Sequence, residues 1–405
     1  MATQNRTPRV SVIIPSFNYQ RFIEAAIASV LSQTMSDLEL LIVDDGSTDR
    51  SPTIISQVSD ARVRYKSLER NQGASQAVNI ALRMATGRFI AICNADDEWQ
   101  PHKLEHQLAI LEAGRAVAVF SDVVWVDDHG VPLDGMRAPS FGGVFAQRNR
   151  SRWTWIRDLM ERGNMLCHPS VLANRDAYNT VGEYDNRLPQ LADLDMWIRM
   201  LLHYDIFVSS AKLVRFRLHQ SNASAPRPDT SCRAINEHRL ILRKTMSEIS
   251  ADDFFRAFGC IATSVDDELD IRIEKALYLL THGGIYRSMF RQLGLELLYD
   301  IMGASAGLDR LSKKYGFDTL AFQREMAVHS PWFDAEAVRA EVEAVRAEVK
   351  ALRVQAHAIL NSTTWRATAG LRSLLSRLPP ALRRNLQSLI LRSQIAQPNT
   401  NPHTN

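Results

Sequence analysis

The chain has 405 residues, of which 45% are hydrophobic and 23% are charged. These proportions are typical of a globular protein, so fibrous and wholly disordered classes are excluded, and the length predicts roughly two to three domains. Lysine and arginine number 48 against 45 aspartates and glutamates, which leaves a net charge of only +3. This balance argues against nucleic acid as a partner.

Cysteine usage and hydropathy indicate the compartment. The four cysteines are scattered without a CxxC pair, as is typical of proteins in a reducing environment. The first residues lack the apolar stretch of a secretory signal, and no apolar run reaches the roughly 18 residues of a membrane-spanning helix. We therefore expect a cytoplasmic protein that does not cross a membrane. The cysteines are Cys93, Cys167, Cys232 and Cys260.

The first hundred residues alternate short β-rich runs with longer amphipathic stretches. Such alternation predicts an α/β fold with a Rossmann-like, mostly parallel sheet flanked by helices. The apolar residues of the longer stretches recur at helical spacing. The predicted strands are 10–15, 38–44, 63–67 and 88–93, and the predicted helices are 19–33 and 73–86.

The pattern changes along the rest of the chain. We predict that the α/β domain occupies residues 1–228 and that a helical region follows over 229–330. Within the first domain, the later predicted elements are strands at 116–120 and 123–126, a loop at 129–143, and helices at 153–162 and 193–202.

The C-terminal residues carry two further signals. Apolar residues spaced alternately by four and three predict a short coiled coil over 331–360, and hence a homo-oligomer. Residues 361–405 carry arginines but no acidic residue and form a basic amphipathic tail with a disordered end. Such a tail can lie on an anionic membrane surface or pack on the protein or a partner, and both interpretations stay open.

Polar and acidic residues follow three of the predicted strands. The first strand leads into Pro15-Ser16-Phe17-Asn18, the second ends in Asp44-Asp45-Gly46, and the fourth leads into Asn94-Ala95-Asp96-Asp97. The carboxyl ends of parallel strands line one crevice. Any one of these acids alone is readily explained by helix capping or a turn. Together they are costly unless a cation or a hydroxyl-rich ligand binds them.

These motifs resemble the nucleotide-sugar domain of family-two glycosyltransferases. The resemblance covers about residues 9–224 and includes Asn71-Gln72-Gly73, Gly182-Glu183-Tyr184-Asp185, Asp193-Leu194-Asp195-Met196-Trp197 and Arg217-Leu218-His219. It implies a GT-A fold and an inverting transfer from a nucleoside-diphosphate sugar. A short stretch, 361–369, resembles a tail of bacterial cell-surface polysaccharide proteins.

The resemblance also implies roles for individual residues. Asp193 aligns with the catalytic base, and Asp195 is the competing candidate. Asp96 aligns with a carboxylate that binds Mg²⁺ or Mn²⁺, and His219 is expected near the metal or the diphosphate. The expected nucleotide-binding residues are Pro15, Phe17, Asn18, Asp44, Asp45, Gly73, Asn79, Asn94 and Asp96. Phe17 as a core aromatic and His219 as an ordinary buried histidine are the competing interpretations.

The sequence departs from the family pattern at three positions. Asn94 replaces an aspartate of the metal motif, Val78 replaces a common arginine, and Ala192 replaces a common glutamate before the base. These departures keep an alternative open: an inactive nucleotide- or glycan-binding scaffold that assembles through the coiled coil. A nucleotidyltransferase is a third alternative, but its basic glycine-rich phosphate loop is missing from the sequence.

The expected reaction is therefore transfer from a UDP- or dTDP-sugar to a glycan or lipid-linked acceptor in bacterial surface polysaccharide synthesis. The expected partners are that donor and that acceptor, and the expected cofactor is a divalent metal. Contact with the inner membrane is expected to be peripheral.

Overall fold

The computed structural model describes residues 7–222, 225, 227–262, 264–328, 346, 349, 350 and 352. The chain divides into two compact units, Met1–Pro331 and Trp332–Asn405. The predicted coiled coil and basic tail lie almost entirely outside the described residues. No described helix has both the length and the hydropathy that a membrane-spanning segment needs.

A sheet of eight strands forms the centre of the first unit, in the order β3-β2-β1-β4-β7-β6-β8-β5. Strands β3, β2, β1 and β4 are parallel, whereas β7 and β5 run antiparallel to their neighbours. The strands are β1 (Val10–Ser16), β2 (Leu38–Asp44), β3 (Val63–Ser67), β4 (Phe89–Ile92), β5 (Glu98–Trp99), β6 (Ala118–Val126), β7 (Leu172–Asn174) and β8 (Ile206–Arg217).

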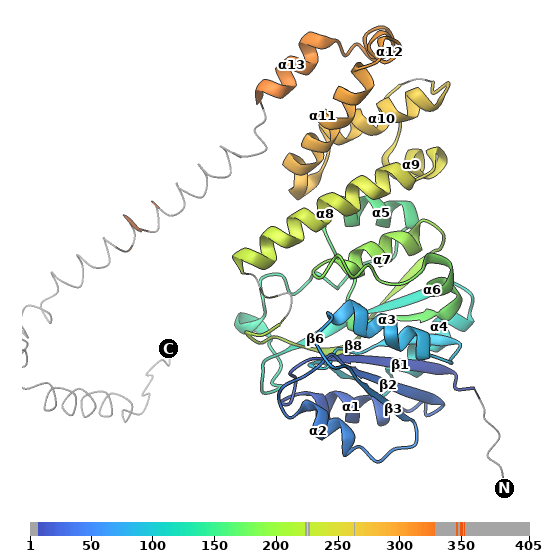
Figure 1. The fold of residues 1–405 in the computed structure, drawn as a ribbon, viewed down its shortest axis with the longest axis vertical. Helices are drawn as coiled ribbons and strands as arrows, with labels where there is room; N and C mark the ends of the chain where they lie inside the picture. The colour runs from blue at the N-terminus through green and yellow to red at the C-terminus, as the bar shows by residue number, and fades with distance from the viewer. Residues whose placement is uncertain are drawn as a thin grey trace, which may run out of the picture. The chain divides into compact units, whose positions relative to one another are not determined.

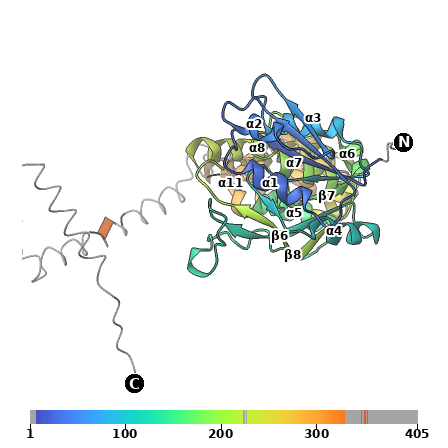
Figure 2. The same ribbon diagram turned by 90° about the horizontal axis from the view of Figure 1, so that it is seen from below.

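Helices cover both faces of this sheet (Figures 1 and 2). Alternate residues of a strand point to opposite faces, so Ile13 joins the core beneath one helical layer while Val12 and Ile14 join the other. One layer contains α1 (Ile23–Leu31), α2 (Ser51–Ser56) and α4 (Lys103–Glu112). The other contains α3 (Ala74–Met84), α5 (Arg152–Arg162), α6 (Arg175–Val181) and α7 (Ala192–Leu201).

The predicted fold class, a mostly parallel sheet flanked by helices and followed by a helical region, is confirmed. The core of the second layer continues into the helical region through buried residues such as Leu242, Phe254 and Phe290. This region comprises α8 (Pro228–Glu248), α9 (Ala251–Phe258), α10 (Glu268–Thr281), α11 (Arg287–Met302), α12 (Ser305–Tyr315) and α13 (Thr319–Val328). Short 3-10 turns occur at Gly135–Arg137, His168–Ser170 and Gly284–Tyr286.

Helix α8 connects the helical region to the sheet domain (Figure 1). His238 on α8 is buried, and its imidazole Nε2 lies 2.8 Å from the carbonyl oxygen of Met160 on α5. Lys244, farther along α8, forms an ion pair with Asp195 on α7. The helical region therefore packs directly on α5 and α7, two of the helices that cover this face of the sheet.

Candidate functional site

Three loops leave the same edge of the sheet, because β1, β2 and β4 are parallel and adjacent. Residues 17–22 follow β1, residues 45–50 follow β2, and residues 93–97 follow β4. The carboxyl edge of a parallel sheet is where ligands bind in α/β proteins. The predicted site residues other than Asp193, Asn79 and His219 belong to this edge or to the loop before α3.

Asn18 and Asp44 hold the first two loops together. The backbone N–H of Asn18 donates to Ser47 Oγ at 2.8 Å, and Asn18 Oδ1 accepts from the N–H of Thr48 at 2.8 Å. Asp44 accepts from the N–H and the hydroxyl of Ser47 at 2.9 and 2.6 Å. Asn18 adopts a left-handed φ of 60°, which an asparagine tolerates better than most residues. These bonds tie the loop after β1 to the loop after β2.

Asp45 connects the end of β2 to the start of α3. Its two carboxylate oxygens accept from the N–H groups of Gln72 and Gly73 at 2.7 and 2.8 Å. Burial raises the pKa of Asp45 above its ordinary value, and the nearby charge of Asp44 adds to this effect. Each oxygen keeps a lone pair, so the carboxylate can still accept from the N–H of a bound base.

Phe17 and Asn79, two of the predicted nucleotide-binding residues, differ in solvent exposure and in hydrogen bonding. Phe17 follows β1 directly and is 39% exposed, so its ring is available to a ligand and is not a core aromatic. Pro15, two residues before it, is half-buried. Asn79 is buried on α3, where its amide donates to the carbonyl of Tyr184 and accepts from the N–H of Tyr184, both at 2.9 Å. Both amide atoms of Asn79 therefore hold the backbone of Tyr184 in place. A contact between Asn79 and a nucleotide stays a prediction.

Asp96 is surrounded by hydrogen-bond donors after β4. His219 Nε2 lies 3.0 Å from Asp96 Oδ2, and the amide of Asn222 donates to the same oxygen at 3.2 Å. The hydroxyl of Tyr19 also bonds to Asp96, and burial together with the charge of Asp96 raises the pKa of Tyr19. The structure therefore brings together the two predicted metal-binding residues, Asp96 and His219.

Asp97 and Asn94 stabilise the turn that carries Asp96 by hydrogen bonds. Asp97 is buried and accepts from the backbone N–H of Arg217 at 2.8 Å and from the amide of Asn94 at 3.1 Å. Burial, reinforced by the charge of Asp96, raises the pKa of Asp97 well above its ordinary value. The amide of Asn94 therefore stabilises the Asp97 carboxylate. An aspartate at position 94 would lose this hydrogen bond and would repel a charged Asp97.

The donor atoms at Asp96 fit a divalent ion that the protein and a ligand would hold jointly. No cluster of three or more His, Cys, Asp or Glu side chains suited to a metal occurs in the part of the chain that the structure describes. Mg²⁺ is commonly bound through one or two protein oxygens together with substrate phosphates. Asp96 and His219 supply a carboxylate and an imidazole at such a place.

His219 would have to change its hydrogen bonding to bind an ion. The N–H of Ser221 donates to His219 Nδ1 at 3.2 Å, so the neutral ring carries its proton on Nε2, facing Asp96. The ring also packs against Phe22 with centroids 4.9 Å apart. An ion at Nε2 would require the other tautomer and the loss of the Ser221 bond.

Asp193 lies in the first turn of α7. Its oxygens accept from the amide of Asn164 at 2.6 Å and from the N–H of Leu194 at 2.8 Å. Burial raises the pKa of Asp193 to about 6. The carboxylate is therefore mostly ionised at pH 7 but far more basic than an ordinary aspartate, which suits a general base.

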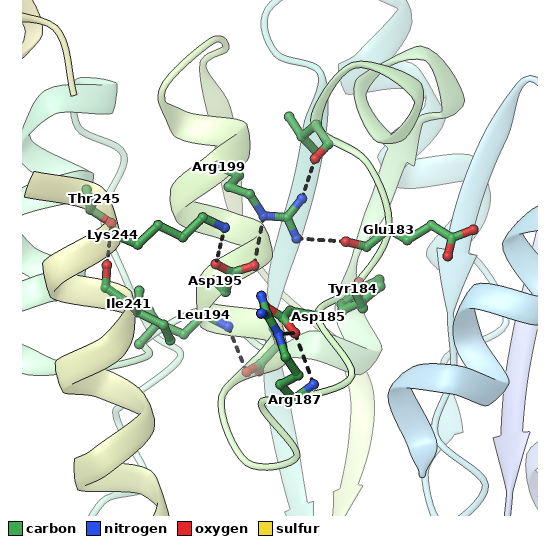
Figure 3. Close-up of polar contacts among 12 residues, drawn as sticks. Glu183, Tyr184, Asp185, Arg187, Leu194, Asp195, Arg199, Ile241, Lys244 and Thr245 are labelled. Atoms are coloured by element: carbon green, nitrogen blue, oxygen red, sulfur yellow. Dashed lines mark hydrogen bonds and ion pairs between the residues drawn. The ribbon is translucent and has the colours of Figure 1, made fainter. Parts of the chain in front are cut away.

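Asp195, the competing candidate, is bound on both sides. It is only 3% exposed and accepts from Arg199 Nε at 2.8 Å and from Lys244 Nζ at 3.3 Å (Figure 3). Arg199 also donates to the backbone carbonyls of Val181 and Glu183. Asp195 thus fixes α7 against α8, and Arg199 ties α7 to the segment that precedes it.

Several contributors to the site were not predicted from the sequence. Tyr19 and Asn222 lie next to the motif residues Asn18 and His219, so their positions offered a weak signal. Asn164 offered none, because it meets Asp193 only through the fold.

Comparison with known proteins identifies the domain. Residues 11–174 match the family model described as glycosyl transferase family 2. These residues form a family-2 glycosyltransferase domain. The resemblance predicted from the motifs is therefore confirmed.

Relatives of the glycosyltransferase domain occur in several bacteria. The putative teichuronic acid biosynthesis glycosyltransferase TuaG of Bacillus subtilis is 40% identical over 132 residues, 32% of this chain and 52% of TuaG. The Escherichia coli protein WfgD, named as a UDP-Glc:alpha-D-GlcNAc-diphosphoundecaprenol beta-1,3-glucosyltransferase, is 43% identical over 102 residues, 25% of this chain and 40% of WfgD. An uncharacterized glycosyltransferase of Nostoc is 36% identical over 163 residues, 40% of this chain and 48% of the relative. The chain spans about half the length of the first of these curated relatives.

Among solved structures, S. aureus TarS is similar with a TM-score of 0.49 and 15% identity, over 74% of this chain and 54% of TarS. The mannosyltransferase PcManGT of Pyrobaculum calidifontis, solved with GDP-Man and Mn²⁺, has a TM-score of 0.48 and 16% identity, over 82% of this chain and 88% of PcManGT.

Proposed function

We propose that the protein is an inverting glycosyltransferase that moves a sugar from a nucleoside diphosphate to a hydroxyl of a glycan or lipid-linked acceptor. The observation that carries this proposal is the contrast between the two aspartates of α7. Asp195 is neutralised by Arg199 and Lys244, whereas Asp193 has a pKa of about 6 and no cationic partner among the described residues. An inverting transfer needs such a carboxylate.

In this mechanism Asp193 accepts the proton of the acceptor hydroxyl. The acceptor oxygen then forms a bond to the anomeric carbon while the bond from that carbon to the diphosphate breaks, and the diphosphate leaves on the opposite face. Asp96 and His219 would hold a divalent ion, which when bound neutralises charge on the leaving group. Phe17, Pro15 and Asp45 would bind the base at the ends of β1 and β2.

The name of WfgD supports a uridine donor and a diphosphoundecaprenol-linked acceptor, and that of TuaG supports a bacterial surface glycan. We extend these to the present chain as the proposed donor, acceptor and pathway class. A cytoplasmic location with peripheral membrane contact through the tail, and assembly through the coiled coil, belong to the same proposal.

Phe17→Ala is expected to weaken UDP binding about 5- to 100-fold, because stacking of a base on an aromatic ring is worth about 1–3 kcal/mol. Stability should change little, since the ring is exposed. Isothermal titration of UDP in the presence of Mn²⁺ measures the effect. Phe141→Ala is the matched control, because Phe141 is also exposed but lies in the loop after β6. Equal affinity of the Phe17 variant and the wild type would contradict the assigned base site.

Turnover tests the function itself. With UDP- and dTDP-sugars supplied in turn, an active transferase releases nucleoside diphosphate, slowly even when water is the acceptor. The scaffold alternative predicts nucleotide binding without release. Binding without release for every donor, with and without Mn²⁺ or Mg²⁺, would therefore favour the scaffold.

A further inference from the structure

Glu237 on α8 reaches across to the start of α7. It is only 4% exposed, and its Oε2 accepts from the backbone N–H groups of Gln190 and Leu191 at 2.9 and 2.8 Å. Its other carboxylate oxygen is buried and has no hydrogen-bond partner within the described ranges. A buried, half-satisfied carboxylate costs stability, which calls for an explanation beyond packing.

Asp193 stands two residues after Leu191, the second of these N–H donors. Unpaired N–H groups at a helix start stabilise a nearby carboxylate anion and so weaken it as a base. Glu237 takes two N–H groups at the start of α7 and places a negative charge beside them. The charge of Glu237 is one of the influences that raise the pKa of Asp193, after the larger effect of burial.

We propose that Glu237 is a positioning residue that fixes the start of α7 and keeps Asp193 basic enough to take the acceptor's proton. This inference rests on the proposed function, in which Asp193 is the base. It also gives the helical region a part in catalysis, because α8 lies outside the matched residues 11–174.

Within the described ranges, several other titratable groups near Asp193 and Glu237 are paired or neutral. Burial lowers the pKa of His168 to about 4 and raises the pKa of Tyr184, so the hydrogen-bonded ring pair is neutral at pH 7. Two ion-pair groups also face this region: Asp185 with Arg187, and Asp195 with Arg199 and Lys244 (Figure 3).

The positive charge of Arg233, also on α8, lowers the pKa of Glu237. Arg233 itself lies near Asp229 on the same helix, with Nη2 3.9 Å from Oδ2. Burial raises the pKa of Glu237, and the charge of Asp185 contributes in the same direction. Glu237 is therefore the negative group whose removal should change the basicity of Asp193 most directly.

The test compares Glu237→Gln with Glu248→Gln in the full chain. Glutamine keeps a carbonyl oxygen for the two N–H groups but removes the charge, and Glu248 is an exposed glutamate on the same helix. We expect Glu237→Gln to move the acidic limb of the pH–rate profile by about 0.5–1 unit toward lower pH and to lower the plateau rate severalfold. Glu248→Gln should leave both as in the wild type.

A second readout is independent of turnover. The carboxyl carbon resonance of Asp193, assigned by its loss in Asp193→Asn, should titrate at lower pH in Glu237→Gln than in the wild type. An unchanged titration, with a rate lowered equally at every pH, would overturn the proposal and leave Glu237 a structural residue. If Asp193→Asn stayed fully active, the base assignment would fail, whereas the resonance would still report whether the two carboxylates interact.

Discussion

Asp193→Asn is expected to lower the rate of sugar transfer about 10³-fold, within the range that general base catalysis contributes. An amide cannot accept the proton of the acceptor hydroxyl at neutral pH. The Asn oxygen can still accept from Leu194, but its NH₂ group would face the donor of Asn164, so one hydrogen bond is lost. The stability cost should be about 1 kcal/mol, too little to unfold the domain.

The measurement is nucleoside diphosphate release at saturating donor, together with donor binding by titration calorimetry. Binding should match that of the wild type, since Asp193 is not among the proposed nucleotide-binding residues. Asp205→Asn is the matched control, because Asp205 is exposed shortly after the end of α7. A variant Asp193→Asn that transfers sugar at the wild-type rate would rule out Asp193 as the base.

Asp195→Asn is expected to act on stability and not on chemistry. Asp195 is 3% exposed and neutralises Arg199 and Lys244, so removing its charge leaves two cations without their partner. Breaking a buried ion pair from one side costs about 3 kcal/mol or more of the free energy of unfolding. The rate per folded molecule should stay within about tenfold of the wild type.

Urea unfolding of the wild type, Asp195→Asn and Asp205→Asn measures this cost. Transfer assays on the folded fraction then separate stability from catalysis. If Asp195→Asn folded as stably as the wild type but lost transfer about 10³-fold, the roles assigned to the two aspartates would be reversed.

The parallel half of the sheet could be predicted largely because its central strands β1 and β2 are nearly continuous apolar runs. Val10–Ser16 and Leu38–Asp44 are buried on both faces, and such strands are recognisable without knowing their neighbours. The other half, in which β7 and β5 run antiparallel to their neighbours, was harder to predict. The two strands predicted at 116–120 and 123–126 form the single strand β6, whose register against β8 shifts between Ser121 and Val123. This irregularity interrupts the strand pattern in the sequence.

Other elements were missed for different reasons. Strand β8 (Ile206–Arg217) mixes buried and exposed positions without a strict alternation, so its pattern is not that of a simple strand. Helix α4 carries Leu104, Leu108 and Leu111 at helical spacing, but it is only ten residues long and begins soon after the acidic turn that follows β4. Strand β5 has only two residues and exists through its pairing with β8.

The sequence motifs identified most residues of the candidate site, but they could not decide whether Asp193 or Asp195 is the more suitable base. The difference between them depends on Lys244, which is 49 residues from Asp195, and on Asn164, which is 29 residues from Asp193. Glu237 is likewise 46 residues from Leu191. Such contacts arise only when α8 and the segment after α5 pack against α7, and no local pattern encodes them.

The pH dependence of transfer by the wild-type protein tests the central claim most directly. Because the folded-state pKa of Asp193 is raised to about 6, the carboxylate gains a proton as the pH falls through that value. With donor and acceptor saturating, the rate should be level above pH 7 and fall about tenfold for each pH unit well below 6. A rate that stays constant from pH 7 down to pH 4.5, while the protein remains folded, would contradict proton transfer to Asp193.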